Sequence, residues 1–290
     1  MTITELRNEY IAQKRALGSS KHTVKNYECD LKAFDNYMKE KNIIDVTSIT
    51  RRDIQNFVIY LSDVKKNQPK SVHRKLSSIK NMFEHAMIEE YVDKTPVLGI
   101  KMPKIAKKLP VYMTKTEAKR FLDAAKDNLR DYTMIMTWLY TGIRVEEMVS
   151  LTKNDINFDI KILLIRGKGS KEREVGISSD IIKLIRKYLK QRNDDSEYLF
   201  ISRNKTGMTT EAARNIVKKY KEKAKIKKNI TPHKLRHTLA TLLLQAGVET
   251  STIKEILGHE SIATTQIYAH VSKTQMRKSA KKNPLFSEEE

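Results

Sequence analysis

Two candidate functional side chains lie at the predicted start of one helix. In the segment TPHKLRHTLATLLLQAG, Thr231 is a candidate N-cap, Pro232 suits the first helical position and Gly247 suits the end of the helix. His233 and Arg236 then share one face near the helix N-terminus, where free N–H groups and the helix dipole favour an anion. The guanidinium can bind two phosphate oxygens. The alternative is that both residues simply occupy a helix start, and this segment alone does not decide between the two.

The next segment, IKEILGHESIATTQIYAHVS, adds a candidate nucleophile. Gly258 is predicted to end one helix, His259 lies at the junction, and a helix that begins at Ser261 presents Tyr268. Attack of a phenol oxygen on a phosphodiester builds negative charge, so it requires fixed cations around the phosphate. The alternative is that Tyr268 packs as an ordinary amphipathic side chain, and it stands unless cations surround the phenol.

Both segments resemble a known family. PHKLRHTLATLLLQAG and LGHESIATTQIYAHV are similar to the C-terminal signature of tyrosine recombinases, the family of phage integrases and Xer proteins. YTGIRVEEMVSLTKNDI matches a third family segment at Arg144 and at the supporting acidic residue Glu147. GKGSKEREVGI resembles the family's mobile β-hairpin, which puts the catalytic lysine at Lys168, with Lys171 as the rival assignment. The resemblance implies these catalytic residues: Arg144, Lys168, His233, Arg236, His259 and the nucleophile Tyr268.

These residue types suit DNA cleavage through a 3′-phosphotyrosyl bond, the product that the resemblance implies. Arg144 and Arg236 offer planar, permanently charged groups to the non-bridging oxygens, so we expect no metal ion and no cofactor. A free tyrosine has a pKa of about 10, so its proton must leave during attack, and His233 is the candidate acceptor. We assign Lys168 as general acid for the leaving 5′ oxygen and His259 as a hydrogen-bond partner of the phosphate.

A zinc site is the chemical alternative, because His233 and His237 are spaced as in a zinc-binding helix. The sequence HKLRH lacks a glutamate after the first histidine, and Lys234 and Arg236 would repel a dication. We therefore predict no metal site.

The charge of the chain indicates a polyanionic partner. Lys and Arg number 56 against 35 Asp and Glu, a formal net charge of +21 over 290 residues. Residues 214–228 hold eight basic side chains and one acidic one, more than a solvated helix face requires, although a genomic lysine bias explains part of the excess. The charge favours nucleic acid as the partner, and the family resemblance implies that it is double-stranded DNA. The candidate DNA contacts are Lys101, Lys104, Lys107, Lys108, Lys171, Arg214, Lys218 and Lys219.

We expect a cytoplasmic protein. No apolar stretch approaches the roughly 20 residues that a bilayer requires, so we predict no membrane span. The N-terminus lacks the basic-then-apolar arrangement of a signal peptide, and the single Cys29 cannot form an internal disulfide.

Apolar spacing and capping signals predict the elements that position these residues. Residues 1–100 show helical spacing, with starts at Thr2 and Thr50, and form four or five helices in one domain. Residues 101–113, rich in lysine and proline, form a basic linker. The domain 114–290 begins with a capping box at Thr114 and is helical to about residue 122, again from about 132 to 150, and from about 179 onward. Residues 161–166 and 172–177 read as a β-hairpin within it.

The predicted fold is mainly α with a small β-hairpin or sheet (α+β) in the C-terminal domain. The resemblance implies a two-domain DNA clamp, made of a helical, SAM-like core-binding domain and a tyrosine recombinase catalytic domain. The leading hypothesis is an Xer-like site-specific DNA recombinase. Integration or excision of a mobile element and Xer-type dimer resolution are both compatible with the sequence. A type IB topoisomerase and a non-catalytic architectural DNA-binding protein are the alternatives.

The resemblance also implies how the protein assembles. Recombinases of this family act as tetramers on synapsed DNA, whereas a topoisomerase needs no synapsis. The segment after Tyr268 carries apolar residues that can dock on a neighbouring subunit, namely Val271, Met276, Leu285 and Phe286. We therefore expect a homo-oligomer that exchanges its C-terminal segment between subunits, and a second recombinase or an accessory factor is a further candidate partner.

Overall fold

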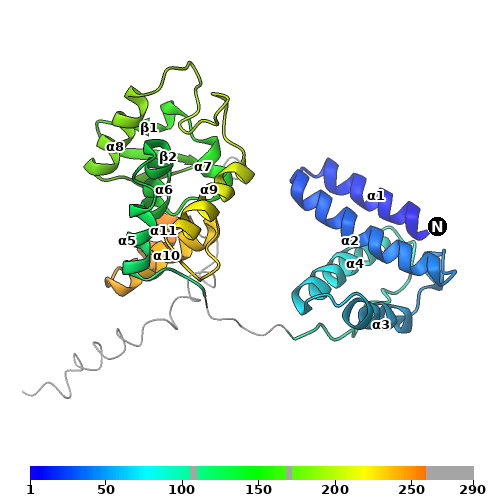
Figure 1. Ribbon diagram of the computed structural model, residues 1–290. Helices are drawn as coiled ribbons and strands as arrows, with labels where there is room; N and C mark the ends of the chain where they lie inside the picture. Colours follow the sequence, from blue (N-terminus) through cyan, green and yellow to red (C-terminus); the bar gives the residue numbers. More distant parts are fainter. Residues whose placement is uncertain (105–109, 168–171, 259–290) are drawn as a thin grey trace, which may run out of the picture. The chain divides into compact units, whose positions relative to one another are not determined.

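The computed structural model describes residues 1–104, 110–167 and 172–258. The chain divides into two compact units, residues 1–108 and 109–290 (Figure 1). Among the described residues, none of the helices combines the length and apolar character that crossing a bilayer would require.

The N-terminal unit is helical. Its elements are α1 (Ile3–Ala16), α2 (Lys21–Glu40), a 3₁₀ turn (Val46–Ser48), α3 (Arg51–Ile59), a π-helical turn (Tyr60–Val64) and α4 (Pro69–Ile88). The predicted capping boxes at Thr2 and Thr50 are confirmed, with Glu5 and Asp53 as their acidic partners. Phe34, Phe57 and Phe83 are fully buried at the centre of the unit, so the helices share one apolar core.

The C-terminal unit combines helices with a small sheet. Its elements are α5 (Lys115–Asp123), α6 (Leu129–Thr141), α7 (Val145–Ser150), a 3₁₀ turn (Lys153–Asp155), β1 (Ile156–Asn157), β2 (Ile162–Arg166), β3 (Glu172–Gly176), α8 (Ser179–Lys190), α9 (Thr210–Lys223), α10 (Pro232–Gln245) and α11 (Thr250–Leu257). Thr114 and Glu117 form the predicted capping box of α5. Trp138 on α6 is fully buried in the core.

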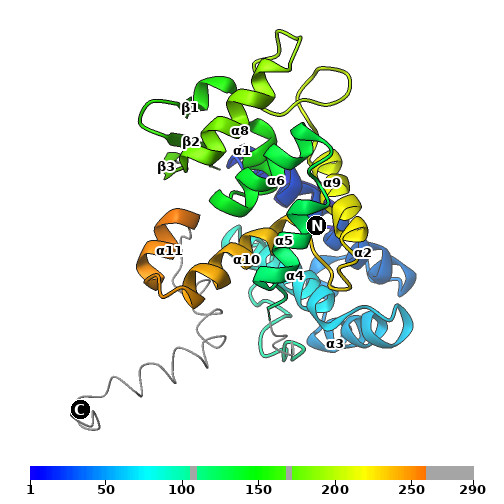
Figure 2. The same ribbon diagram turned by 60° about the vertical axis from the view of Figure 1, so that its left-hand side comes forward.

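The predicted hairpin is confirmed, and it gains a short third strand. The sheet has the order β1-β2-β3, and all pairs are antiparallel. Leu163 pairs with Val175 and Ile165 with Arg173. Leu163, Ile165 and Val175 are buried, which fixes one face of the sheet toward the core, and α8 lies beside the strands in both views (Figures 1 and 2).

The prediction of one helix from about residue 132 to 150 is wrong in one respect, because the structure has two helices there. α6 ends at Thr141, where Gly142 adopts a left-handed conformation with φ 62°, and α7 begins at Val145. An isolated glycine in a helical pattern is tolerated, so the apolar spacing did not reveal the break. The three residues between the helices form a tight turn that ends at Arg144.

Within the described residues, the last two helices, α10 (Pro232–Gln245) and α11 (Thr250–Leu257), agree with the prediction. Thr231 is the N-cap residue of α10, although its side chain makes no capping hydrogen bond, and Pro232 takes the first position. Gly258 caps α11 with a φ of 63°. α11 packs beside α10 (Figure 2). The predicted fold class, mainly α with a small sheet in the C-terminal part, is therefore confirmed.

Candidate active site

The turn between α6 and α7 positions Arg144. The indole Nε1 of buried Trp138 donates to the carbonyl oxygen of Ile143 at 2.7 Å, which fixes the turn to α6. Arg144 is the N-cap residue of α7, and its backbone N–H donates to Glu147 Oε2 at 2.8 Å. The Arg144 side chain is 45% exposed, so a rigid backbone presents a guanidinium that solvent and substrate can reach.

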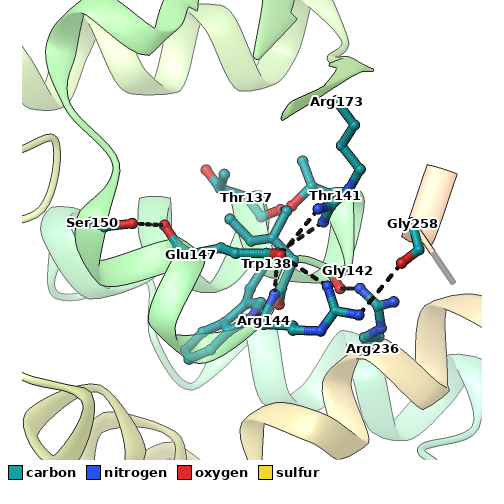
Figure 3. A network of polar contacts seen from close by, with 11 residues as sticks. Thr137, Trp138, Thr141, Gly142, Arg144, Glu147, Ser150, Arg173, Arg236 and Gly258 are labelled. Carbon is teal, nitrogen blue, oxygen red and sulfur yellow. Dashed lines mark hydrogen bonds and ion pairs between the residues drawn. The ribbon is translucent and has the colours of Figure 1, made fainter. Parts of the chain in front are cut away.

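The N-terminal half of α10 brings Arg236 to the same place. Arg236 is only 2% exposed, and its Nη1 donates to the carbonyl oxygen of Gly142 at 2.9 Å (Figure 3). The carbonyl of Gly142 can face α10 because the left-handed turn has no side chain there. An added Cβ would lie 2.5 Å from Leu257 Cδ2 and 2.9 Å from Leu239 Cδ2. The two arginines predicted to bind phosphate therefore meet at one turn.

Glu147 is a buried carboxylate that lies between two guanidinium groups. Its Oε1 accepts from Arg144 Nη1 at 2.9 Å and from Arg173 Nη1 at 3.0 Å, and its Oε2 accepts from Arg173 Nη2 at 2.8 Å (Figure 3). Burial alone raises the pKa of Glu147, but hydrogen bonds from Arg173 and Arg144 outweigh it and lower the pKa to about 2. The carboxylate is therefore ionised at neutral pH and orients the side chain of Arg144.

A groove of about 640 Å³ opens beside these residues. Its basic lining comes from the α6–α7 turn, from α9 and from the start of α10: Arg144, Arg214, Lys218, Lys221, His233 and Arg236. The two acidic lining residues, Glu146 and Glu211, each lie 3.6 Å from the guanidinium of Arg214. The groove therefore has an excess of positive charge, as a site for a phosphodiester requires.

His233 lies in the groove, whereas His237 is buried behind it. The His233 ring packs edge-on against His237, with ring centroids 4.5 Å apart. Within the described ranges, no three histidine, cysteine or carboxylate side chains gather in a way that could hold a metal ion. The two histidines thus pack as an aromatic pair on successive turns of α10.

The other sequence-predicted residues divide into two groups. Lys107, Lys108, Lys168, Lys171, His259 and Tyr268 lie outside the described residues. Of the described ones, Lys101 and Lys104 are exposed in the N-terminal unit, and Arg214 and Lys218 line the groove. Lys219 does not line the groove. Its Nζ lies 3.3 Å from Tyr220 Oη and 3.8 Å from Asp131 Oδ2.

Sequence reasoning missed Lys221 and Arg173. Lys221 lies three residues after Lys218 on α9, so it shares the face that Lys218 presents to the groove. The signal for Arg173 is the alternation of β3. Because side chains alternate along a strand, Arg173 lies on the same inward face as buried Val175, two residues further on. A guanidinium on that face needs a partner of opposite charge.

Comparisons with known proteins show which family the chain resembles. Residues 111–275 match the phage integrase family, and residues 8–90 match the N-terminal SAM-like domain of phage integrases. The tyrosine recombinase XerD of Staphylococcus epidermidis is 35% identical over 271 residues, 90% of this chain and 92% of that protein. The tyrosine recombinase XerC of Leptospira interrogans is 34% identical over 267 residues, 89% of this chain and 86% of that protein.

A solved structure shows a similar fold. A crystal structure of the XerH site-specific recombinase, in a post-cleavage complex with a palindromic difH substrate, gives a TM-score of 0.77 at 21% identity. The similarity covers 92% of this chain and 82% of that one.

These matches define a tyrosine-type site-specific DNA recombinase. The chain belongs to the phage integrase family.

Proposed function

We propose that this protein cuts and rejoins duplex DNA at a specific site through a 3′-phosphotyrosyl intermediate on Tyr268. One observation carries the proposal. Arg144 and Arg236 meet at the α6–α7 turn and both line one basic groove. Two guanidiniums held by buried partners suit a phosphate whose non-bridging oxygens gain charge during attack.

The reaction exchanges one phosphoester for another. The phenol oxygen of Tyr268 bonds to phosphorus, and the bond from phosphorus to the 5′ oxygen breaks. His233, which is exposed in the groove, accepts the phenol proton, and Lys168 supplies a proton to the 5′ oxygen. His259 hydrogen-bonds the phosphate. Because the two esters are of similar energy, a hydroxyl from a second DNA strand can reverse the step without ATP or a metal ion.

The rest of the chain would hold the duplex. In this proposal, residues 1–100 form a core-binding domain, residues 101–113 form a basic linker along the DNA backbone, and residues 114–290 form the catalytic domain of a two-domain clamp. Arg74 is a cation of the N-terminal unit that is both fixed and accessible. Its Nη1 contacts the fully buried carboxylate of Asp30, while the Arg74 side chain stays 47% exposed. A guanidinium held in this way keeps its orientation toward a phosphate or a base edge.

We further propose that the protein acts as a tetramer on two synapsed sites, with the C-terminal segment exchanged between subunits. A second recombinase or an accessory factor would join this assembly if the site is asymmetric. Integration or excision of a mobile element and resolution of chromosome dimers are the two roles that fit such a reaction.

A capture experiment followed by a strand-exchange assay tests the proposal. The wild-type protein is incubated with a genomic DNA library, covalent complexes are isolated under denaturing conditions, and the attached ends are sequenced. Two differently labelled duplexes that carry the captured site are then mixed with the protein. We expect recombinant duplexes with exchanged flanks. Relaxation of supercoiled DNA without any recombinant product would contradict the proposal and would favour a topoisomerase.

A further inference from the structure

Arg173 on β3 has no part in the mechanism above, yet it contacts the centre of the site. We propose that Arg173 is a positioning residue of the recombinase, which holds Glu147 and Gly258 and thereby fixes Arg144 relative to the hairpin. The inference rests on the proposed function, because it concerns the same cleavage step.

Arg173 acts through Glu147 and not on the substrate. Its Nη1 and Nη2 donate to both carboxylate oxygens of Glu147, at 3.0 and 2.8 Å, which is a bidentate pair (Figure 3). Its side chain is 17% exposed and does not line the groove, whereas that of Arg144 is 45% exposed and does. Arg173 therefore binds one side of the carboxylate and leaves Arg144 on the accessible side.

The charge balance explains why a second arginine is useful. Arg144 and Glu147 alone form a neutral pair, which would present little net charge to a phosphate. With Arg173, two guanidiniums surround one carboxylate, and the cluster keeps a net positive charge next to the groove. Glu147 thus orients Arg144 without cancelling the charge of the site.

Arg173 also contacts the end of α11. An added Cβ on Gly258 would lie 2.8 Å from Arg173 Cδ and 2.9 Å from Arg173 Nε, so the arginine fills the space that a side chain would need. The carbonyl oxygen of Gly258 accepts from Arg144 Nη2 at 3.4 Å. The capping residue of α11, which directly precedes His259 in the sequence, is therefore held by both arginines.

The same residue belongs to the hairpin and lies close to the segment that connects its two strands. Arg173 pairs with Ile165 across the two strands, and the segment with Lys168 and Lys171 connects those strands. The ion pair between Arg173 on β3 and Glu147 on α7 therefore couples two elements. One is the strand that follows the candidate general acid, and the other is the helix whose N-cap residue is Arg144. Arg173 therefore contacts or belongs to three segments: the start of α7, the end of α11 and the hairpin. The family resemblance assigns Arg144, His259 and Lys168 to these segments or to the residues next to them.

The test measures cleavage of a nicked duplex that carries the captured site, under single-turnover conditions at saturating protein. Arg173→Met removes the guanidinium and keeps the length of the chain, and Arg173→Lys keeps the charge but not the bidentate fork. The matched control is Arg166→Met on the adjacent strand, whose guanidinium pairs with Asp155 and Glu172 and does not contact Glu147. Fluorescence of Trp138 and circular dichroism check that each variant is folded.

We expect Arg173→Met to slow adduct formation about 10- to 100-fold, because small displacements of positioned groups have effects of that size. Arg173→Lys should fall between Arg173→Met and wild type. DNA affinity should change less than about twofold, and Arg166→Met should cleave as wild type does. The pH profile gives a second readout. Among the described residues, Arg144 and Arg173 are the charged groups that contact Glu147. Loss of Arg173 therefore raises the pKa of Glu147 and moves the acid limb of the cleavage rate to higher pH.

The outcomes separate the inference from the function. If wild type forms no adduct, the proposed function fails. If wild type cleaves and both Arg173 variants cleave at the same rate with the same pH profile, the inference is wrong although the function stands. If Arg173→Met does not fold, Arg173→Lys decides, and a wild-type rate and pH profile for that variant would overturn the inference.

Discussion

The buried guanidinium of Arg236 donates from Nη1 to the carbonyl oxygen of Gly142 at 2.9 Å. This hydrogen bond joins α10 to the turn that ends at Arg144, two residues further along the chain. The carbonyl of one glycine therefore links the two arginines that we propose to bind phosphate.

Substitution of Gly142 should destabilise the C-terminal unit. In Gly142→Ala the new methyl group would clash with Leu257 and Leu239, and the φ of 62° is unfavourable for alanine. We expect a loss of about 2–4 kcal/mol in the free energy of unfolding. Trp138 is the only tryptophan, so its fluorescence during urea unfolding reports on this unit alone. The control is Gly176→Ala, where no heavy atom lies within 4 Å of the added Cβ. Equal stability of the two variants would contradict this packing.

The Glu147 carboxylate should make the C-terminal unit sensitive to acid. Its pKa is about 2 in the folded protein against an ordinary value of 4.5, so its contribution is complete above pH 4.5 and is lost as the pH falls toward 2. Glu147→Gln should lower the stability at pH 7 by up to about 3 kcal/mol and flatten its dependence on pH in this window. Urea unfolding at a series of pH values measures both effects. Glu146→Gln, which alters a 68% exposed carboxylate, should do neither.

Arg236 should be required for cleavage more than for binding. Arg236→Lys keeps the charge, but an ammonium cannot contact the Gly142 carbonyl and a phosphate through one planar fork. We expect cleavage of a nicked duplex to slow about 10²- to 10³-fold, with DNA affinity near that of wild type in a gel-shift assay. Arg186→Lys on α8, where the guanidinium lies over the Phe158 ring, is the control and should cleave normally. Full cleavage by Arg236→Lys would be incompatible with direct phosphate binding by this residue.

The α9 lysines should differ in their contribution to DNA binding. Lys218 and Lys221 line the groove, while the Nζ of Lys219 lies beside Tyr220 and Asp131. Lys218→Gln and Lys221→Gln should each weaken binding and reduce the slope of log K against log salt by about 0.9, the value for one lost phosphate contact. Lys219→Gln should leave the slope unchanged. A loss of slope in Lys219→Gln as large as in Lys218→Gln would show that the groove is not the DNA path.

Local patterns in the sequence predicted most of the elements. The capping boxes at Thr2, Thr50 and Thr114 depend on residues three apart, and the hairpin depends on alternation around a glycine-containing turn. All the residues that form such a signal lie close together in the sequence. The helix break at Gly142 was not predicted, because a glycine does not by itself end a helix. The side chains that leave no room for a Cβ there, Leu239 and Leu257, lie far along the chain.

The contacts of the site could not be predicted from the same patterns. Arg236 and Gly142 are 94 residues apart, and Arg173 and Glu147 are 26 apart, so only the folded chain brings them together. The family resemblance assigned site roles to Arg144, Glu147, His233 and Arg236. The structure places Arg144, His233 and Arg236 along one groove, with Glu147 behind Arg144. Arg173 was overlooked because its contacts form only in the folded chain. It pairs with Glu147 on α7, and it fills the space that a side chain at Gly258 would occupy.

The most direct test of the central claim is to identify the residue that becomes joined to DNA. Wild-type protein and Tyr268→Phe are incubated with a nicked duplex carrying the captured site, digested with nuclease and protease, and analysed by mass spectrometry. We predict that the wild-type peptide containing Tyr268 carries a nucleotide through a phosphodiester and that Tyr268→Phe yields no adduct. An adduct on another residue, or an undiminished yield from Tyr268→Phe, would contradict the account.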